Sequence, residues 1–81
     1  MRELREIAAE IQADWQVINN AGAREALDCM NNMGAITDRF GADSNGYQVV
    51  GVFLNNSIGW RGPVARRVKK ELRQMCGHPR P

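Results

Sequence analysis

The sequence predicts an all-α protein that folds as a compact single-domain bundle of about four short helices. Three observations support this class. Apolar residues recur at helical spacing over most of the 81 residues. Only one run, residues 47–60, is rich enough in β-branched and aromatic residues to suggest a strand. A lone strand has no partner for its backbone hydrogen bonds, so this run is also assigned to a helix.

Two long helices are predicted in the first half of the chain. The first covers residues 2–18, with an apolar stripe at Leu4, Ile7, Ala8, Ile11, Trp15 and Ile18. Asn and Gly in residues 19–22 end it, because both tolerate positive φ. The second covers residues 23–40, with a stripe at Ala26, Cys29, Met30, Met33, Ile36 and Phe40. Gly34 lies inside it and costs about 1 kcal/mol relative to Ala, which indicates a bend or a close neighbour.

Two further helices are predicted in the second half. Residues 45–57 form a helix that is apolar nearly all round, as a central core helix is, and Asp43 and Ser44 are its candidate N-caps. Residues 63–76 form the last helix, because Pro63 suits the first helical position and Gly77 with Pro79 stops it. Its inward face consists of Val64, Ala65, Val68, Leu72 and Met75.

The net charge of +2 conceals an asymmetry along the chain. Residues 1–59 carry four basic and eight acidic residues, whereas residues 60–81 carry seven basic residues and one acidic residue. Such a chain can fold its basic helix against its own acidic helices, assemble head to tail with a second copy, or bind a polyanion. Because a domain this short buries only about 60% of its unfolded surface, we expect a homo-oligomer.

The residue types offer little for catalysis or for a cofactor. His78 is the one histidine and lies close to the end of the chain, and Cys29 and Cys76 lack the spacing of a metal site. No phosphate-binding loop and no nucleophile elbow is present. We therefore expect a protein that is not an enzyme and that holds neither metal nor cofactor. The chain also lacks a signal peptide and a membrane-spanning run, which predicts a soluble protein of the cytoplasm.

A basic stripe is predicted on the outer face of the last helix. Arg66, Lys69, Lys70 and Arg73 fall at i, i+3, i+4 and i+7. A helix that reads DNA bases would add Asn, Gln, Ser or Thr at exposed positions, and here Gln74 alone is available. The stripe is interpreted as a solvated or protein-facing surface. Nucleic-acid phosphate and an anionic small molecule are the less favoured alternatives.

The tripeptide that precedes the last helix is the second candidate site. Arg61 lies just before a helix N-terminus, where the positive end of the macrodipole disfavours a cation. The first hypothesis is structural: Arg61 pairs with an internal carboxylate, with Asp14 and Asp43 as the best candidates. In the same hypothesis Trp60 packs against Trp15 in the core.

The second hypothesis assigns a ligand to this tripeptide. Arg61 and the free N–H groups at the start of the last helix would receive an anion such as a phosphate, although Pro63 removes one of these donors. Trp60 or Tyr47 would then stack on a base of the ligand. With Asn55, these five residues form the candidate ligand- or partner-binding site.

Most of the chain, and most strongly the stretch from Val49 to Leu72, resembles a family of small helical proteins encoded by bacteriophages. The likeness rests on EIxxEI and DW in the first helix and on VVxxFLxNxxxWRGxxARRxKxEL from Val49 to Leu72. It departs from the family pattern at NNAGAREAL, residues 19–27, and at Pro63, where an acid is common. The resemblance implies a phage accessory protein that acts in the cytoplasm of the host cell.

These observations together predict a binding protein rather than an enzyme. The favoured function is inhibition of a host defence or host-takeover target through stoichiometric binding to a host protein. One alternative is an oligomeric sponge for anionic signalling nucleotides. The other alternative is a small basic DNA-binding regulator.

Overall fold

The computed structural model describes residues 2–37, 39–40 and 44–77 and has the all-α fold that the sequence predicts. Within these residues the helices are α1 (Leu4–Asp14), α2 (Ala21–Met30), α3 (Gly46–Asn55) and α4 (Pro63–Gly77). The short segments β1 (Arg39–Phe40) and β2 (Ser44–Asn45) pair antiparallel ahead of α3. None of these helices is long and apolar enough to cross a membrane.

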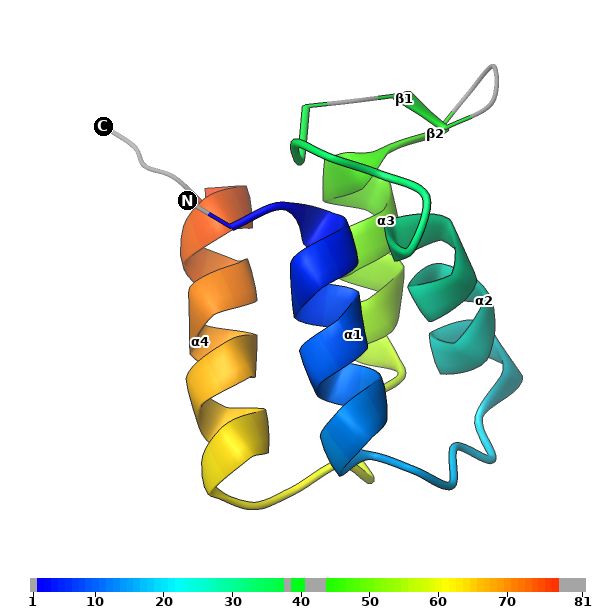
Figure 1. Ribbon diagram of the computed structural model, residues 1–81, viewed down its shortest axis with the longest axis vertical. Helices are drawn as coiled ribbons and strands as arrows, with labels where there is room; N and C mark the ends of the chain where they lie inside the picture. Colours follow the sequence, from blue (N-terminus) through cyan, green and yellow to red (C-terminus); the bar gives the residue numbers. More distant parts are fainter. Residues whose placement is uncertain (1, 38, 41–43, 78–81) are drawn as a thin grey trace.

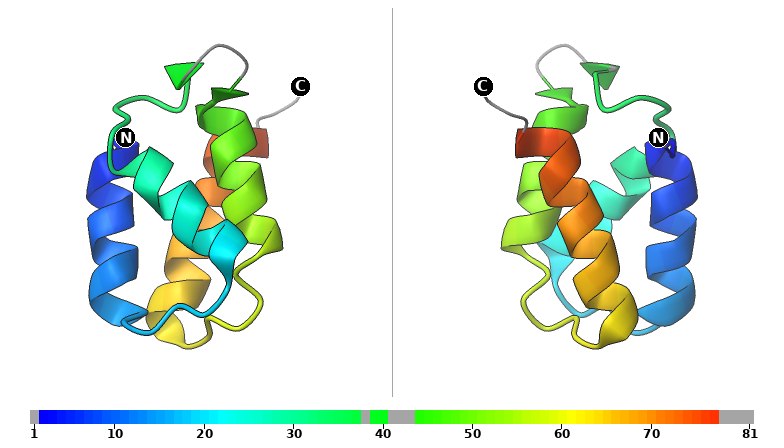
Figure 2. Two further views of the ribbon diagram at one scale, coloured as in Figure 1. Left: turned by 90° about the vertical axis from the view of Figure 1, so that its right-hand side faces the viewer. Right: turned by 90° about the vertical axis from the view of Figure 1, so that its left-hand side faces the viewer.

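Successive helices run in opposite directions, so the loops collect at the two ends of the bundle (Figure 1). The connectors of residues 15–20 and 56–62 lie at one end. The β1–β2 pair, the start of α1 and the end of α4 lie at the other end. Seen from the side, α2 runs obliquely across the space between α1 and α3 (Figure 2).

All four helices contribute to a common hydrophobic core. The predicted stripe of α1 is buried through Ile11, and α4 buries the residues assigned to its inward face except Val64, which is partly buried. The largest fully buried side chains are Phe53, Leu4, Ile7, Ile11, Leu27, Met30, Leu72, Val50 and Val68. The apolar run of α3 is therefore a core helix, as predicted, and no strand forms from it.

The predicted second helix is wrong beyond residue 30, because α2 ends at Met30 and the described residues that follow, 31–37 and 39–40, are not helical. The first N–H groups of a helix have no partner within that helix. Here Leu4 N–H donates to the Gly34 carbonyl at 2.8 Å, and Arg5 N–H donates to the Met33 carbonyl at 3.1 Å. Residues 31–37 therefore leave the helical path to cap α1, while Met33 and Ile36 still reach the core.

The other boundaries differ by smaller amounts. The predicted first helix extends too far, since α1 ends at Asp14 and Trp15 has non-helical backbone angles (φ −98°, ψ 82°). The N-cap of α3 is Asn45, whose side chain accepts from the Gln48 N–H at 3.0 Å and whose own N–H donates to the Gln48 side chain. Ser44, predicted as a cap, lies in β2, and Asp43 lies outside the described residues.

Candidate protein-binding surface

Three aromatic side chains pack together beneath the connector end. Trp15 and Trp60 stack with ring centroids 5.9 Å apart and an interplanar angle of 5°. Phe53 meets both edge to face, at 6.3 Å from Trp15 and 6.1 Å from Trp60. The predicted packing of Trp60 on Trp15 is confirmed. Aromatic pairs in these geometries stabilise a fold by more than the area they bury. The packed rings therefore support the two connectors.

Asp14 accepts a hydrogen bond from Trp60 and does not pair with Arg61. The indole N–H of Trp60 donates to the Asp14 carboxylate at 2.8 Å, because α1 ends beside the stacked rings. Arg61 is exposed, and among the described residues no carboxylate lies within ion-pair distance of it. The predicted pairing of Arg61 with Asp14 is therefore wrong, and the second candidate, Asp43, lies outside the described residues.

Lys69 holds the α3–α4 connector from its position on α4. Its ammonium donates to the carbonyls of Ser57 and Trp60, both at 2.6 Å, and lies 5.8 Å from the centroid of the Trp60 ring. Burial, followed by repulsion from Arg73 and Arg61, lowers the pKa of this ammonium. Lys69 therefore has a structural role, and its prediction as a solvated member of the basic stripe is corrected.

Gly62 is where the α3–α4 connector turns into α4. It has a φ of 114°, a backbone conformation that costs a residue with a side chain far more than glycine. Its carbonyl accepts from the Arg66 N–H at 3.0 Å and so begins the hydrogen bonding of the helix. Gly62 thus fixes the geometry of the candidate site without offering a side chain to a ligand.

Two aliphatic side chains project from the two connectors into solvent. Val17 is 74% exposed and Ile58 is 73% exposed. Both line a hollow of about 400 Å³, whose other lining residues are Trp15, Asn19, Asn20, Asn55, Asn56 and Gly59. We call the exposed side chains of Val17, Asn19, Asn55 and Ile58 the connector surface.

The asparagines of this hollow divide into two kinds. Asn20 accepts from the Ala23 N–H at 3.0 Å and caps α2, and Asn56 donates to the Val52 carbonyl at 2.8 Å. Asn19 and Asn55 are exposed and leave their amides for a partner. The connector surface therefore combines an apolar centre with polar groups at its edge.

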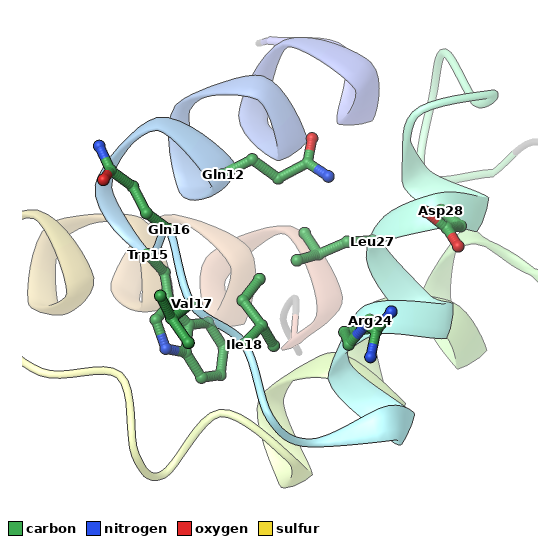
Figure 3. A pocket seen from close by; sticks show the side chains of 8 residues that line it. All are labelled: Gln12, Trp15, Gln16, Val17, Ile18, Arg24, Leu27 and Asp28. Carbon is green, nitrogen blue, oxygen red and sulfur yellow. The ribbon is translucent and has the colours of Figure 1, made fainter.

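A second hollow of about 440 Å³ lies on the other side of the α1–α2 connector. It shares Trp15 and Val17 with the first hollow. Gln12 of α1 and Leu27 of α2 project into the space between these helices (Figure 3). Val17 therefore separates the two hollows and projects between them toward a partner.

The five predicted site residues are not brought together. Trp60 is only 2% exposed, so its ring is not available to stack on a base. Asn55, Arg61 and Gly62 lie at the connector end. Tyr47 lies in the first turn of α3 at the opposite end, beside a separate hollow that Arg2 and Met75 also line. The arrangement predicted for a stacked nucleotide therefore does not form.

Sequence reasoning missed Val17 and Ile58. Val17 fell inside the predicted first helix but outside its apolar stripe, and Ile58 fell between the predicted third and last helices, so neither was named as a candidate. The available signal was an aliphatic residue next to turn formers, as in VINN and NSIG. Binding residues lie disproportionately on loops, so an aliphatic residue in a polar turn is a candidate for exposure and binding.

The basic residues of α4 fall on two sides of the helix. On the side toward α1, Arg67 pairs with Glu10, and Arg2 bridges Glu10 and Glu71 at 2.7 and 2.6 Å. The Arg67 and Arg2 guanidinium groups lower the pKa of the Glu10 carboxyl. Part of the charge on α4 is thus neutralised by acidic residues of the same chain. This is one of the three outcomes expected from the sequence, in which the basic helix folds against the acidic helices. Arg66, Lys70 and Arg73 are exposed on the remaining surface.

Neither cysteine is an activated nucleophile. Burial raises the pKa of both thiols, and Asp28 and Glu25 raise that of Cys29 further. Within the described part of the chain, no group of three or more His, Cys, Asp or Glu side chains is arranged to hold a metal ion. No family model, no curated protein and no solved structure matches this chain.

Proposed function

We propose that this protein works by stoichiometric binding to another protein through the connector surface. The observation that carries this proposal is the exposure of Val17 and Ile58, at 74% and 73%, beside one hollow. Protein interfaces concentrate their binding energy in a few apolar anchors surrounded by polar groups. Val17 and Ile58 supply the anchors, and Asn19 and Asn55 supply the polar edge.

The connector surface is also held in place before a partner arrives. The Trp15–Trp60 stack lies beneath it, and Lys69 ties down the carbonyls of Ser57 and Trp60. A preorganised surface loses little conformational entropy on binding, which favours affinity. This support fits a protein that acts by occupying its target.

We further propose that the partner is a host protein of a defence or takeover pathway, bound and blocked in the cytoplasm of the host cell. The resemblance of Val49 to Leu72 to small bacteriophage proteins supports this part of the proposal. An inhibitor of this kind needs no catalytic residues, because one copy neutralises one target.

A pull-down from host lysate tests the proposal. The bait proteins are the wild type, the double variant Val17→Ser/Ile58→Ser, and Val52→Ser as a matched control. Val52 is also an exposed aliphatic residue, at 46%, but it belongs to α3 and lines a separate hollow between α2 and α3. We expect a host protein that the wild type and the control retain and that the double variant loses.

Two results would count against the connector surface. One is a host protein that all three baits retain equally, which would place binding elsewhere. The other is the absence of any protein enriched by the wild type. Thermal melts of the three baits check that a loss of binding is not caused by unfolding. We expect similar melting temperatures, since substitutions of exposed residues usually change stability by no more than about 0.5 kcal/mol.

A further inference from the structure

A second surface, which adjoins the connector surface at Arg61 and runs along α4, carries unbalanced positive charge. Arg61, Arg66, Lys70 and Arg73 are exposed, and we call them the α4 basic face. In the part of the chain that the structure describes, none of the four has a carboxylate within ion-pair distance. Glu71, the acidic residue of α4, is engaged with Arg2 on the side toward α1.

The neighbouring helix does not offset this charge. The sequence of α3, GYQVVGVFLN, contains no charged residue. Lys69 lies among the cations of α4, and repulsion from Arg73 and Arg61 lowers its pKa after the larger effect of burial. Like charges held close together without counter-charges raise the free energy of the empty surface. A bound anion would relieve that repulsion.

The spacing of the cations suits a regular row of anions. Arg66, Lys70 and Arg73 follow one another at i, i+4 and i+7 along α4, which places them on one stripe. At about 1.5 Å of rise per residue, the stripe is about 10 Å long from Arg66 to Arg73. Arg61 precedes the helix and lies close enough to Lys69 to act on its pKa, as Arg73 also does.

The same surface lacks the apolar anchors of a tight protein interface, which leaves it only weak, charge-driven contacts with proteins. An interface between proteins needs apolar anchors near its centre. The large hydrophobic side chains that are exposed in the described residues lie elsewhere: Val17 and Ile58 on the connectors, Val52 beside α2, and Tyr47 at the start of α3. Contacts to nucleic-acid phosphates need cations but no apolar centre.

We propose that the α4 basic face binds the phosphodiester backbone of a nucleic acid without reading its sequence. Of the residue types that address base edges, the helix exposes Gln74 alone beside its cations. The interaction is therefore electrostatic, and it is independent of the protein partner proposed for the connector surface.

Fluorescence anisotropy with two labelled probes tests this site. The probes are a 20-base-pair DNA duplex and a single-stranded RNA of 20 nucleotides, each titrated at 50 and 200 mM KCl. If three or four phosphates are neutralised on duplex DNA, the fourfold rise in salt weakens binding about 40- to 150-fold. We expect measurable binding at 50 mM with a loss of this size, and the tighter of the two probes identifies the natural source of the backbone.

A matched pair of variants separates the site from net charge. Lys70→Gln/Arg73→Gln and Arg5→Gln/Arg24→Gln each remove two exposed cations, from α4 and from α1 and α2 respectively. We expect the first to weaken binding at least tenfold at 50 mM KCl and to reduce the salt slope by about two. The second should weaken it less than threefold.

Three results would overturn the proposal. The first is no binding of either nucleic acid at 50 mM KCl. The second is an equal loss in the two variants, which would show a response to net charge alone. The third is binding of poly-L-glutamate as tightly as either nucleic acid, which would assign the α4 basic face to an acidic protein surface instead.

Discussion

Lys69 is the side chain on which the position of the α3–α4 connector most directly depends. Its half-buried ammonium satisfies the carbonyls of Ser57 and Trp60 at once. Ser57 is fully buried, so water has limited access to replace the ammonium there. The neighbouring Lys70 is exposed and makes no contact of this kind. Two adjacent lysines therefore have different roles, one in the fold and one on the surface.

We expect Lys69→Met to lower the free energy of unfolding by about 1.5–3 kcal/mol, because hydrogen bonds to a charged group contribute about that much. Lys70→Met, the same change at the exposed neighbour, should stay within about 0.5 kcal/mol of the wild type. Urea unfolding followed by tryptophan fluorescence measures both. Equal stability of the two variants would show that the connector does not depend on Lys69.

Residue-level prediction succeeded for the packing of Trp60 on Trp15 and failed for Arg61. Trp15 belongs to the predicted apolar stripe of the first helix, Trp60 lies three residues before the last helix, and both side chains are large enough to favour burial, so the sequence gives reason to expect that they meet. Which side chain the Asp14 carboxylate accepts from depends on the orientation of the Trp60 ring. Ring orientation is a product of the assembled core, and one sequence does not contain it.

At the scale of elements, the helix ends that depend on neighbouring residues are the predictable ones. The ends of α3 and α4 fall within two residues of the predicted bounds, because Asn45 and Pro63 act locally. The end of α2 was unpredictable, because Met33 and Ile36 continue the helical spacing of apolar residues. Their segment leaves the helix to cap α1, a partner almost 30 residues away in the sequence.

The contact between the 31–37 segment and α3 makes Gly46 indispensable. A Cβ on Gly46 would overlap the backbone carbonyl of Ile36, whereas a Cβ on Gly51 would meet no atom within 4 Å. We expect Gly46→Ala to destabilise the protein by about 1–3 kcal/mol through overpacking. Gly51→Ala should stabilise it by about 0.5–1 kcal/mol, since alanine favours a helix interior.

Thermal and urea unfolding of the two glycine variants measure these opposite changes. The Gly51 variant is the control for the general effect of adding a methyl group to α3. If Gly46→Ala were as stable as Gly51→Ala, the 31–37 segment would not pack against the start of α3 as described.

At the scale of the whole molecule, charge is divided between two pairs of helices. Residues 2–30, which contain α1 and α2, carry three basic and six acidic residues. Residues 46–77, which contain α3 and α4, carry six basic residues and one acidic residue. The pairs of Glu10 and Glu71 with Arg2 and Arg67 neutralise only the seam between α1 and α4. The outer faces of the domain remain opposite in sign.

The apolar argument for a homo-oligomer is weaker than the sequence suggested. Of the large apolar side chains Met30, Met33, Phe53 and Leu54, which a second copy could have covered, the first three are at most 2% exposed within one chain and Leu54 is partly buried against the core. The opposite charges of the two outer faces are the remaining reason to expect self-association. A contact of this kind is heterologous, since one face of each copy meets a different face of the next.

We therefore expect a self-association that depends on salt. Light scattering after gel filtration at micromolar concentration should give a mass above the 9.1 kDa of one chain in 25 mM KCl. In 300 mM KCl it should fall toward that value, because exposed charges more than a few ångströms apart are then largely screened. Lys70→Gln/Arg73→Gln should lower the mass in 25 mM KCl, whereas Val17→Ser/Ile58→Ser should leave it unchanged. If Val17→Ser/Ile58→Ser alone lowers the mass to that of one chain, at either salt concentration, the copies associate through their apolar side chains and not through their opposite charges. A mass of one chain under all conditions would contradict self-association itself.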